Sequence, residues 1–294
     1  MTGAEPVAVD APLSQLGEGP IWCARDRALY WVDVVGKALF RLQPSTGKVD
    51  VRSIPYAPSA IIPYDAGGLL LITKKGMALM DFDKEGLDSI SIKGIDFSRE
   101  VFNDAACDKN GLLWVGTRDI NAKEPRGNLY SMGRDFSLAK HTEGLMIANG
   151  LGWSPDWRTM YHADSRPGRI DVYDFDADKG AISNRRVMLD YSKREKGRPD
   201  GCTVDAEGGL WVAEVDAWRV ARYLPDGSFH REIKVPTRKP TSVMFGGDDL
   251  DTLYITSMRF GLSPEELADQ PLAGSLFAVK PGPKGRVEPS FASR

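Results

Sequence analysis

Short apolar runs alternate with polar, glycine-containing turns along the whole chain. "EVFNDAACDKNGLLWVGT" at 100–117 and "GRPDGCTVDAEGGLWVAE" at 197–214 share one layout: a polar residue, a short apolar run, an Asp, a turn, and then Leu, Trp and Val. This layout predicts a β-hairpin, because aromatic and β-branched residues favour strands and turn residues separate them. Helical periodicity is never sustained, and "SPEELADQ" at 263–270 is the best candidate for a short helix.

The hairpin layout occurs six times at regular intervals. Its copies centre on Trp31, Leu71, Trp114, Tyr161, Trp211 and Tyr254, with steps of 40, 43, 47, 50 and 43 residues. Each interval holds enough strand-like sequence for four strands, so we expect an all-β fold in which residues 1–294 form a single six-bladed β-propeller with four antiparallel strands per blade. A pair of β-sandwiches is the alternative, although sandwiches need no such period. The last blade is one strand short, and residues around Val7–Val9 are predicted to close the ring.

Polar side chains recur twelve residues before the middle of each returning strand. The first strand of a propeller blade lines the central channel, so side chains at this offset are expected to meet at one mouth of the channel. The set is Glu18, Ser59, Asn103, Asn149, Asp200 and Ser242. Carboxylate and amide oxygens are ligands for hard divalent cations, which predicts an ion held there. Each Asp or Asn taken singly also fits a turn residue that bonds to its own backbone.

The loops between second and third strands should lie on the same face as this mouth. They are the segments 118–126, 165–168 and 215–217. Within them Arg118 and Asn121 are candidates to hydrogen-bond a polyol or an anion, and the alternative for Arg118 is a solvated loop charge.

Composition and charge narrow the range of partners. The 294 residues carry a net charge of -3, so there is no excess of basic residues that would indicate binding to nucleic acid or to an anionic membrane surface. There is no apolar run long enough to span a membrane and no secretory leader pattern. Three scattered cysteines, Cys23, Cys107 and Cys202, argue against a disulfide framework, so a cytoplasmic location and a small-molecule partner are expected. The histidines form no zinc-binding pair, and no G-x-S-x-G motif supports a serine hydrolase.

Five segments together resemble the SMP-30/gluconolactonase/luciferin-regenerating family. They are "LGEGPIW" (16–22), "FNDAACD" (102–108), "ANGLGWSPD" (148–156), "RPDGCTVDAEGGLWVA" (198–213) and "TSVMFGG" (241–247). The resemblance covers nearly the whole chain in order. It implies a six-bladed propeller with one divalent ion in the channel and hydrolysis of sugar-acid lactones.

The resemblance also implies roles for individual residues. Glu18, Asn149 and Asp200 fall on the metal ligands, with Asp200 also the base that activates water, and Asn103 falls on a substrate-binding Asn. Ca²⁺ is the first expectation for the ion, and Zn²⁺, Mg²⁺, Mn²⁺ and Fe²⁺ suit the same ligands.

Two substrate-binding positions depart from the pattern of the family's sugar lactonases. Val101 stands where they often carry Arg, and Asn121 falls near a loop Glu of some members. Two alternatives therefore stay open beside the lactonase: a calcium-binding propeller with little catalysis, and an esterase or organophosphate hydrolase on the same site.

Overall fold

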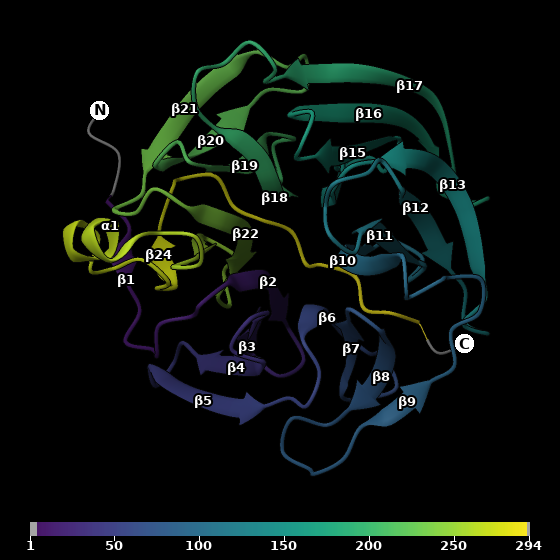
Figure 1. Cartoon of the computed structure of the whole chain (residues 1–294), viewed down its shortest axis with the longest axis horizontal. Coiled ribbons are helices and arrows are strands. Elements are labelled where there is room, and N and C mark those ends of the chain that lie inside the picture. The colour runs from purple at the N-terminus through teal and green to yellow at the C-terminus, as the bar shows by residue number, and fades with distance from the viewer. Residues whose placement is uncertain (1–4, 293–294) are drawn as a thin grey trace.

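Six four-stranded antiparallel sheets surround a central axis in the computed structural model, which describes residues 5–292. Figure 1 shows the sheets as the blades of a ring, with one strand of each blade near the middle. The predicted six-bladed β-propeller with four antiparallel strands per blade is confirmed.

Within each blade the strands follow one another outward in chain order, except in the last. Blade 1 contains β2 (Gly17–Cys23), β3 (Ala28–Asp33), β4 (Ala38–Gln43) and β5 (Lys48–Ser53), and blade 2 contains β6 (Pro58–Pro63), β7 (Leu69–Thr73), β8 (Gly76–Met80) and β9 (Asp88–Ile90). Blade 3 contains β10 (Glu100–Cys107), β11 (Leu113–Asp119), β12 (Gly127–Met132) and β13 (Leu138–Leu145), and blade 4 contains β14 (Ala148–Trp153), β15 (Thr159–Asp164), β16 (Arg169–Asp176) and β17 (Ala181–Asp190). Blade 5 contains β18 (Arg198–Val204), β19 (Leu210–Val215), β20 (Arg219–Tyr223) and β21 (Phe229–Lys234), and blade 6 contains β22 (Pro240–Gly246), β23 (Thr252–Ser257) and β24 (Phe277–Val279).

The N-terminal strand completes blade 6, as the sequence predicts. β1 (Val7–Ala8) pairs antiparallel with β24, with Val7 opposite Ala278. The loop between β23 and β24 holds the one helix of the described residues, α1 (Pro264–Asp269), inside the predicted helical segment. Ser263 and Glu266 form a capping box at its start, which explains why so short a helix is stable there. No helix among residues 5–292 is long and apolar enough to cross a membrane.

An Asp before the inner hairpin turn explains why the chain repeats its layout. The Asp108 carboxylate accepts the backbone N–H groups of Asn110 and Leu112 at 2.8 and 3.2 Å, and its second oxygen accepts the indole N–H of Trp114 at 3.2 Å. Asp205 does the same in blade 5, where its bond from Trp211 is 2.7 Å. One carboxylate thus fixes both the turn and the large side chain that fills the core.

The core lies between neighbouring blades. Trp114 of blade 3 meets Trp153 of blade 4 edge-on, with ring centroids 6.4 Å apart. Trp31, Trp114, Trp153 and Trp211 are all at most 2% exposed. Each buried indole contributes about 3 kcal/mol or more to folding. Cys23, Cys107 and Cys202 are buried free thiols, in agreement with the absence of a disulfide framework.

The C-terminal segment 281–292 crosses the end of the channel at which the inner hairpin turns lie. Figure 1 shows it crossing the middle of the ring. Phe291 and Ala292 donate backbone hydrogen bonds to Pro63 and Gly111, in blades 2 and 3, at 2.8 and 3.1 Å. The Arg286 guanidinium donates to the carbonyl of Trp153 in blade 4 at 2.6 Å. This segment joins separate blades and leaves the opposite end of the channel as the open mouth.

Candidate functional site

A β-bulge interrupts the innermost strand pair of every blade at the same place. The register shifts fall between Glu18 and Ile21, Pro58 and Ala60, Phe102 and Ala105, Asn149 and Leu151, Pro199 and Cys202, and Pro240 and Ser242. A bulge adds one residue to a strand and breaks the in-and-out alternation of its side chains. The six predicted channel residues stand in or beside these bulges, so the local backbone sets the direction in which they point.

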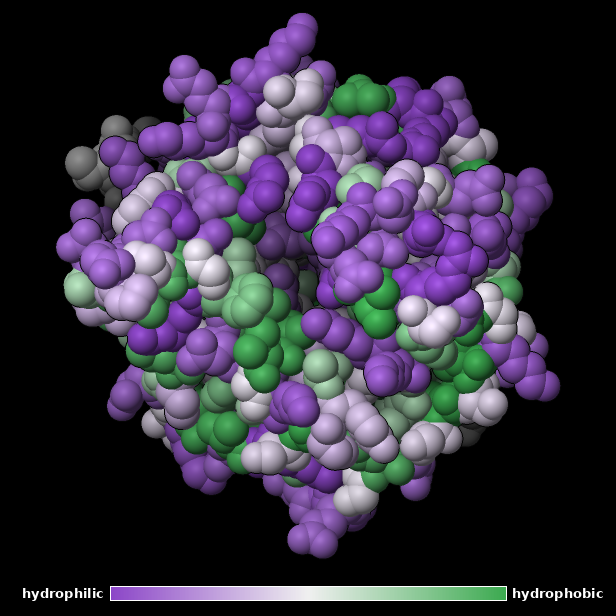
Figure 2. All heavy atoms as spheres, in the orientation of Figure 1, coloured by the Kyte–Doolittle hydropathy of each residue, from purple (hydrophilic) through white to green (hydrophobic). Residues whose placement is uncertain are grey.

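Five of the six predicted channel residues line one cavity of about 260 Å³. They are Glu18, Ser59, Asn103, Asn149 and Asp200, and we call this space the mouth cavity. Ser242 differs, because it lines a smaller cavity deeper in the channel. Figure 2 shows the surface hollowed near the ring axis, with hydrophilic residues along much of the edge. The structure therefore brings together residues that are up to 182 positions apart in sequence, Glu18 and Asp200 being the extremes.

Hydrogen bonds fix the amide of Asn149. Its Nδ2 donates to the Ser165 hydroxyl at 2.8 Å, which turns the Oδ1 atom toward Asn103. Asn103 Nδ2 donates to that Oδ1 at 2.6 Å and to the carbonyl of Ala148 at 2.9 Å. The carbonyl oxygen of Asn149 is thus presented to the channel, the orientation a metal ligand requires.

The two carboxylates of the set repel one another. Enclosure in the channel, followed by the negative charges of Asp200 and Asp104, raises the pKa of Glu18 well above its usual range. Burial and then the charge of Asp104 raise the pKa of Asp200 in the same direction, against a smaller lowering by Arg198. Burial also raises the pKa of Asp104 to about 6. Three acidic groups therefore share one poorly solvated space.

These residues fit a divalent cation. Among the described residues, the Glu18 carboxylate has one hydrogen bond, a long one of 3.4 Å from the N–H of Gly19. Within residues 5–292 no hydrogen bond or ion pair reaches the Asp200 carboxylate. No three His, Cys, Asp or Glu side chains of the described chain form a metal-binding group by themselves, so the third ligand has to be of another kind. The Asn149 oxygen would be that ligand, and an ion there would offset the negative charge of the cavity.

Positive side chains line the rim of the mouth cavity. They are Lys74, Arg118, Arg166 and Arg198. Arg118 confirms the expectation that its loop faces the mouth, and Ser165, Arg166 and Val215 show the same for the other two rim segments. Asn121 is not among the lining residues: it lies on an exposed turn where its backbone N–H donates to Asp119 at 3.1 Å. A substrate contact by Asn121 remains a prediction that the structure does not itself support.

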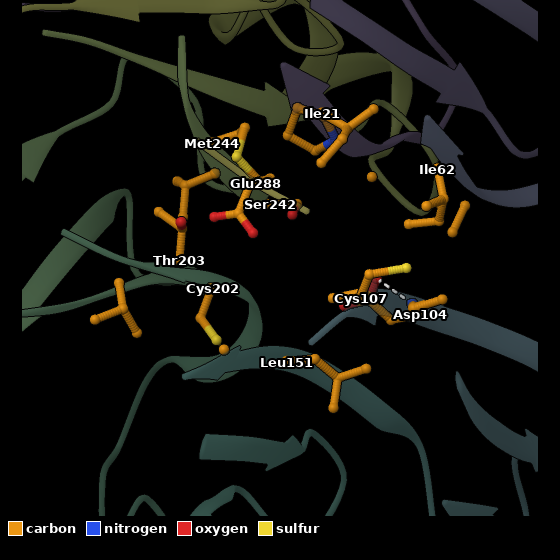
Figure 3. Close-up of a pocket in the computed structure, with 18 of the residues that line it drawn as sticks. Ile21, Ile62, Asp104, Cys107, Leu151, Cys202, Thr203, Ser242, Met244 and Glu288 are labelled. Atoms are coloured by element: carbon orange, nitrogen blue, oxygen red, sulfur yellow. Dashed lines mark hydrogen bonds between the residues drawn. The ribbon is translucent and has the colours of Figure 1, made fainter. Parts of the chain in front are cut away.

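A second cavity of about 40 Å³ lies deeper in the channel and is lined in part by the C-terminal segment. Figure 3 shows Glu288, from that segment, and Asp104 extending into it. Asp104 lines both cavities and so lies between them. Burial raises the pKa of Glu288 to about 7, opposed by the nearby Arg286. The inner cavity has room for about one or two water molecules rather than a sugar.

Sequence reasoning missed Lys74 and Asp104. Lys74 follows β7 at the blade-2 position that Ser165 occupies after β15 in blade 4, so the same rim rule applied to all blades would have found it. Asp104 directly follows Asn103, and only the bulge at this point allows both neighbours to face the channel.

Comparison with known proteins gives one consistent result. The sequence pattern of the SMP-30/gluconolactonase/LRE-like region matches residues 16–259. The chain is 36% identical over 283 residues to a 6-deoxy-6-sulfogluconolactonase of Pseudomonas putida, covering 95% of this chain and 96% of that protein. It is 33% identical to regucalcin of Danio rerio over 90% of each chain. The crystal structure of a calcium-binding protein, regucalcin, from Agrobacterium tumefaciens superposes with a TM-score of 0.91 at 27% identity, covering 99% of this chain and 97% of the other. The protein therefore belongs to the SMP-30/gluconolactonase/LRE-like family.

Proposed function

We propose that this protein hydrolyses sugar-acid lactones with the help of one divalent cation, Ca²⁺ first, held by Glu18, Asn149 and Asp200. Membership of the family and the likeness to a relative named as a lactonase support the reaction class. The likeness to a protein described as calcium-binding supports the cation. The observation that carries the proposal is the meeting of two repelling carboxylates, the buried Asp200 and the half-buried Glu18, and one oriented amide oxygen at the mouth of the channel.

The chain's own residues supply positioning and proton transfer. When bound, the cation supplies a positive charge that polarises a carbonyl group and favours the developing oxyanion. Asp200, whose carboxylate is free of other hydrogen bonds in the described chain, accepts the proton of the attacking water. Asn103 holds hydroxyl groups of the substrate and Arg118 holds a polyol or an anion, because both line the cavity next to the ligand set. Water adds to the acyl carbon, the ring C–O bond breaks, and the products are a carboxylate, a free hydroxyl group and one proton.

The direct test follows proton release from a panel of aldonic-acid lactones, with and without a chelator. We expect turnover that stops on chelation and returns when Ca²⁺ or another divalent ion is added. Asp200→Ala should lower kcat by roughly 10²-fold or more, as expected for loss of a positioned base. The exposed Asp10 provides a matched control, since Asp10→Ala removes a carboxylate far from the cavity. Chelator-insensitive turnover in the folded protein would contradict the mechanism.

A calcium-binding propeller with little catalysis is the second candidate. Its support is the relatives named regucalcin and the buried Val101, which stands where the lactonase pattern often has Arg. The same panel separates the two: a cation that raises the melting temperature while no lactone is consumed indicates the binding protein.

A further inference from the structure

The charge around the mouth cavity is unequal between its floor and its rim. Four cationic side chains line the cavity, Lys74, Arg118, Arg166 and Arg198, against three carboxylates, Glu18, Asp104 and Asp200. Asp104 also lines the inner cavity, and a divalent cation bound by Glu18 and Asp200 would offset two of the carboxylate charges. The rim then holds an excess of positive charge that nothing on the floor compensates. Such a rim attracts an anion.

Three of the rim cations lack a counterion, and two of these are partly buried. Arg198 pairs with Asp216 at 3.0 Å, but no carboxylate of residues 5–292 lies within ion-pair distance of Lys74, Arg118 or the exposed Arg166. Burial, followed by the charge of Arg118, lowers the pKa of Lys74, and burial lowers the pKa of Arg118. Two partly buried like charges from neighbouring blades thus face one cavity, an arrangement that a bound anion stabilises.

Hydrogen bonds hold the Arg118 guanidinium in place but occupy only one of its three nitrogens. Its Nη1 donates to the carbonyls of Asp119 and Ile120 at 2.7 and 3.0 Å, which fixes the plane of the group. No hydrogen bond is made by Nε or Nη2 within the described chain. These two atoms form the edge of the guanidinium that binds the two oxygens of an oxyanion in parallel.

The position of Arg118 suits the far end of a sugar acid. Arg118 lies directly opposite Val101 across the β10–β11 pair. Val101 is two residues before Asn103, at the start of the bulge in β10. Asn103 in turn touches the Asn149 amide of the ligand set. Arg118 and the ligand set line one cavity, so a six-carbon lactone with its carbonyl at the ligand set would direct its terminal carbon toward the guanidinium.

We propose that the lactone carries an oxyanion, a sulfonate, phosphate or second carboxylate, on its terminal carbon, and that Arg118 and Lys74 bind this group. This inference rests on the proposed lactonase function and narrows its substrate class. The bond that breaks is unchanged, because water adds to the acyl carbon and the terminal anion takes no part in the transfer. A neutral aldonolactone leaves both cations without a partner, so the site discriminates against it.

The kinetic test compares gluconolactone with lactones that bear sulfonate, phosphate or carboxylate on carbon 6. The wild type should favour at least one anionic lactone by tenfold or more in kcat/KM, mainly through KM. Arg118→Met should reduce this preference at least tenfold, and Lys74→Met should reduce it less, because an ammonium offers no bidentate edge. The exposed residues Arg134 and Lys93 provide matched controls, and Arg134→Met and Lys93→Met should keep the wild-type preference. The three anionic lactones show which oxyanion the cations prefer.

A binding measurement keeps this inference separate from the proposed function. Calorimetry with the open-chain products, gluconate and 6-deoxy-6-sulfogluconate, requires no turnover. Tighter binding of the sulfonate that weakens tenfold or more in Arg118→Met supports the anion site even if no lactone is consumed. The inference is overturned if neutral and anionic lactones have equal kcat/KM and if the ratio of these values does not change in Arg118→Met or Lys74→Met. The lactonase proposal would stand in that case.

Discussion

Val101 on β10 and Arg118 on β11 lie directly opposite one another in the blade-3 hairpin. Opposed residues of an antiparallel pair project from the same face of the sheet. Val101 is only 2% exposed, whereas Arg118 reaches the mouth cavity. A cation is therefore present on this face of the hairpin although Val101 stands where the resemblance to the family's sugar lactonases leads us to expect Arg. Its source is the neighbouring strand.

Restoring arginine at position 101 should be harmful in this protein. Val101→Arg places a second cation in a buried site beside Arg118, so we expect a loss of about 2–4 kcal/mol in the free energy of unfolding. Combining Val101→Arg with Arg118→Met removes the like-charge contact and should recover part of that loss. Urea unfolding of the two single variants and the double variant measures the coupling. Additive effects would show that the two positions do not share one space.

Ser165 acts as a positioning residue for Asn149. Ser165→Ala removes the acceptor that holds Asn149 Nδ2, so the amide can rotate and present nitrogen to the cation. We expect metal affinity to fall roughly 10–100-fold, the usual effect of losing a partner that orients a ligand. Calorimetric titration of Ca²⁺ measures this directly. Ser165→Thr keeps the hydroxyl group and should rescue affinity, and Ser228→Ala, on an exposed turn, should leave it at the wild-type value.

The metal-free protein should become more stable when Asp200 loses its charge. The folded pKa values of Asp200 and Glu18 are raised, so the carboxylates destabilise the fold at pH values above their ordinary range. Asp200→Asn should therefore raise the free energy of unfolding of chelated protein by about 1–2 kcal/mol at pH 8, and by less near pH 4, where protons already neutralise the pair. The same variant should lose the stabilisation that the wild type gains from Ca²⁺. Asp10→Asn is the control. A metal-free protein that Asp200→Asn destabilises at pH 8 would refute the repulsion.

His162 should make the fold sensitive to mild acid. Its side chain is fully buried on β15, and both ring nitrogens lack a hydrogen-bond partner. Burial, reinforced by Arg185 and Arg169, lowers the pKa of His162 to about 3. The unfolded chain takes up a proton near pH 6.5 while the folded chain does not, so stability falls as the pH drops from about 6.5 toward 3. This one group should cost about 2 kcal/mol between pH 7 and pH 5.

The variant His162→Leu isolates this effect. It should unfold with a smaller difference between pH 7 and pH 5 than the wild type. His230→Leu, at an exposed position, should keep the wild-type difference. An unchanged pH dependence in His162→Leu would show that other groups cause the acid sensitivity.

The fold could be predicted because the hairpin layout recurs in all six blades at a spacing that matches one blade. In blades 3 and 5 an Asp both fixes the turn and holds the indole of the returning strand. The same repeat places Glu18, Asn149 and Asp200 at equivalent points of three blades, and the ring brings equivalent points together. Local sequence therefore determines the geometry of each blade and the direction of its channel residue.

The pairing of the rim charges and the lining of the inner cavity could not be predicted from the repeat. Whether Arg118 is paired depends on which carboxylates of other blades lie near it, and no local pattern encodes that. The place of Asn121 in a rim loop predicts a substrate contact, whereas the structure has Asn121 exposed on a turn. Glu288 lines the inner cavity because the C-terminal segment runs across the ring. Hydrogen bonds to blades 2 to 6, such as that of Arg286 to the carbonyl of Trp153, fix this path.

The most direct test of the central claim is an anomalous difference map from a crystal of the protein soaked in Mn²⁺. We predict one strong peak in the mouth cavity, about 2.0–2.6 Å from oxygens of Glu18, Asn149 and Asp200. A crystal of Asn149→Ala soaked in parallel should show a much weaker peak. A peak in the inner cavity beside Glu288, or none at all in a crystal that diffracts well, would contradict the account.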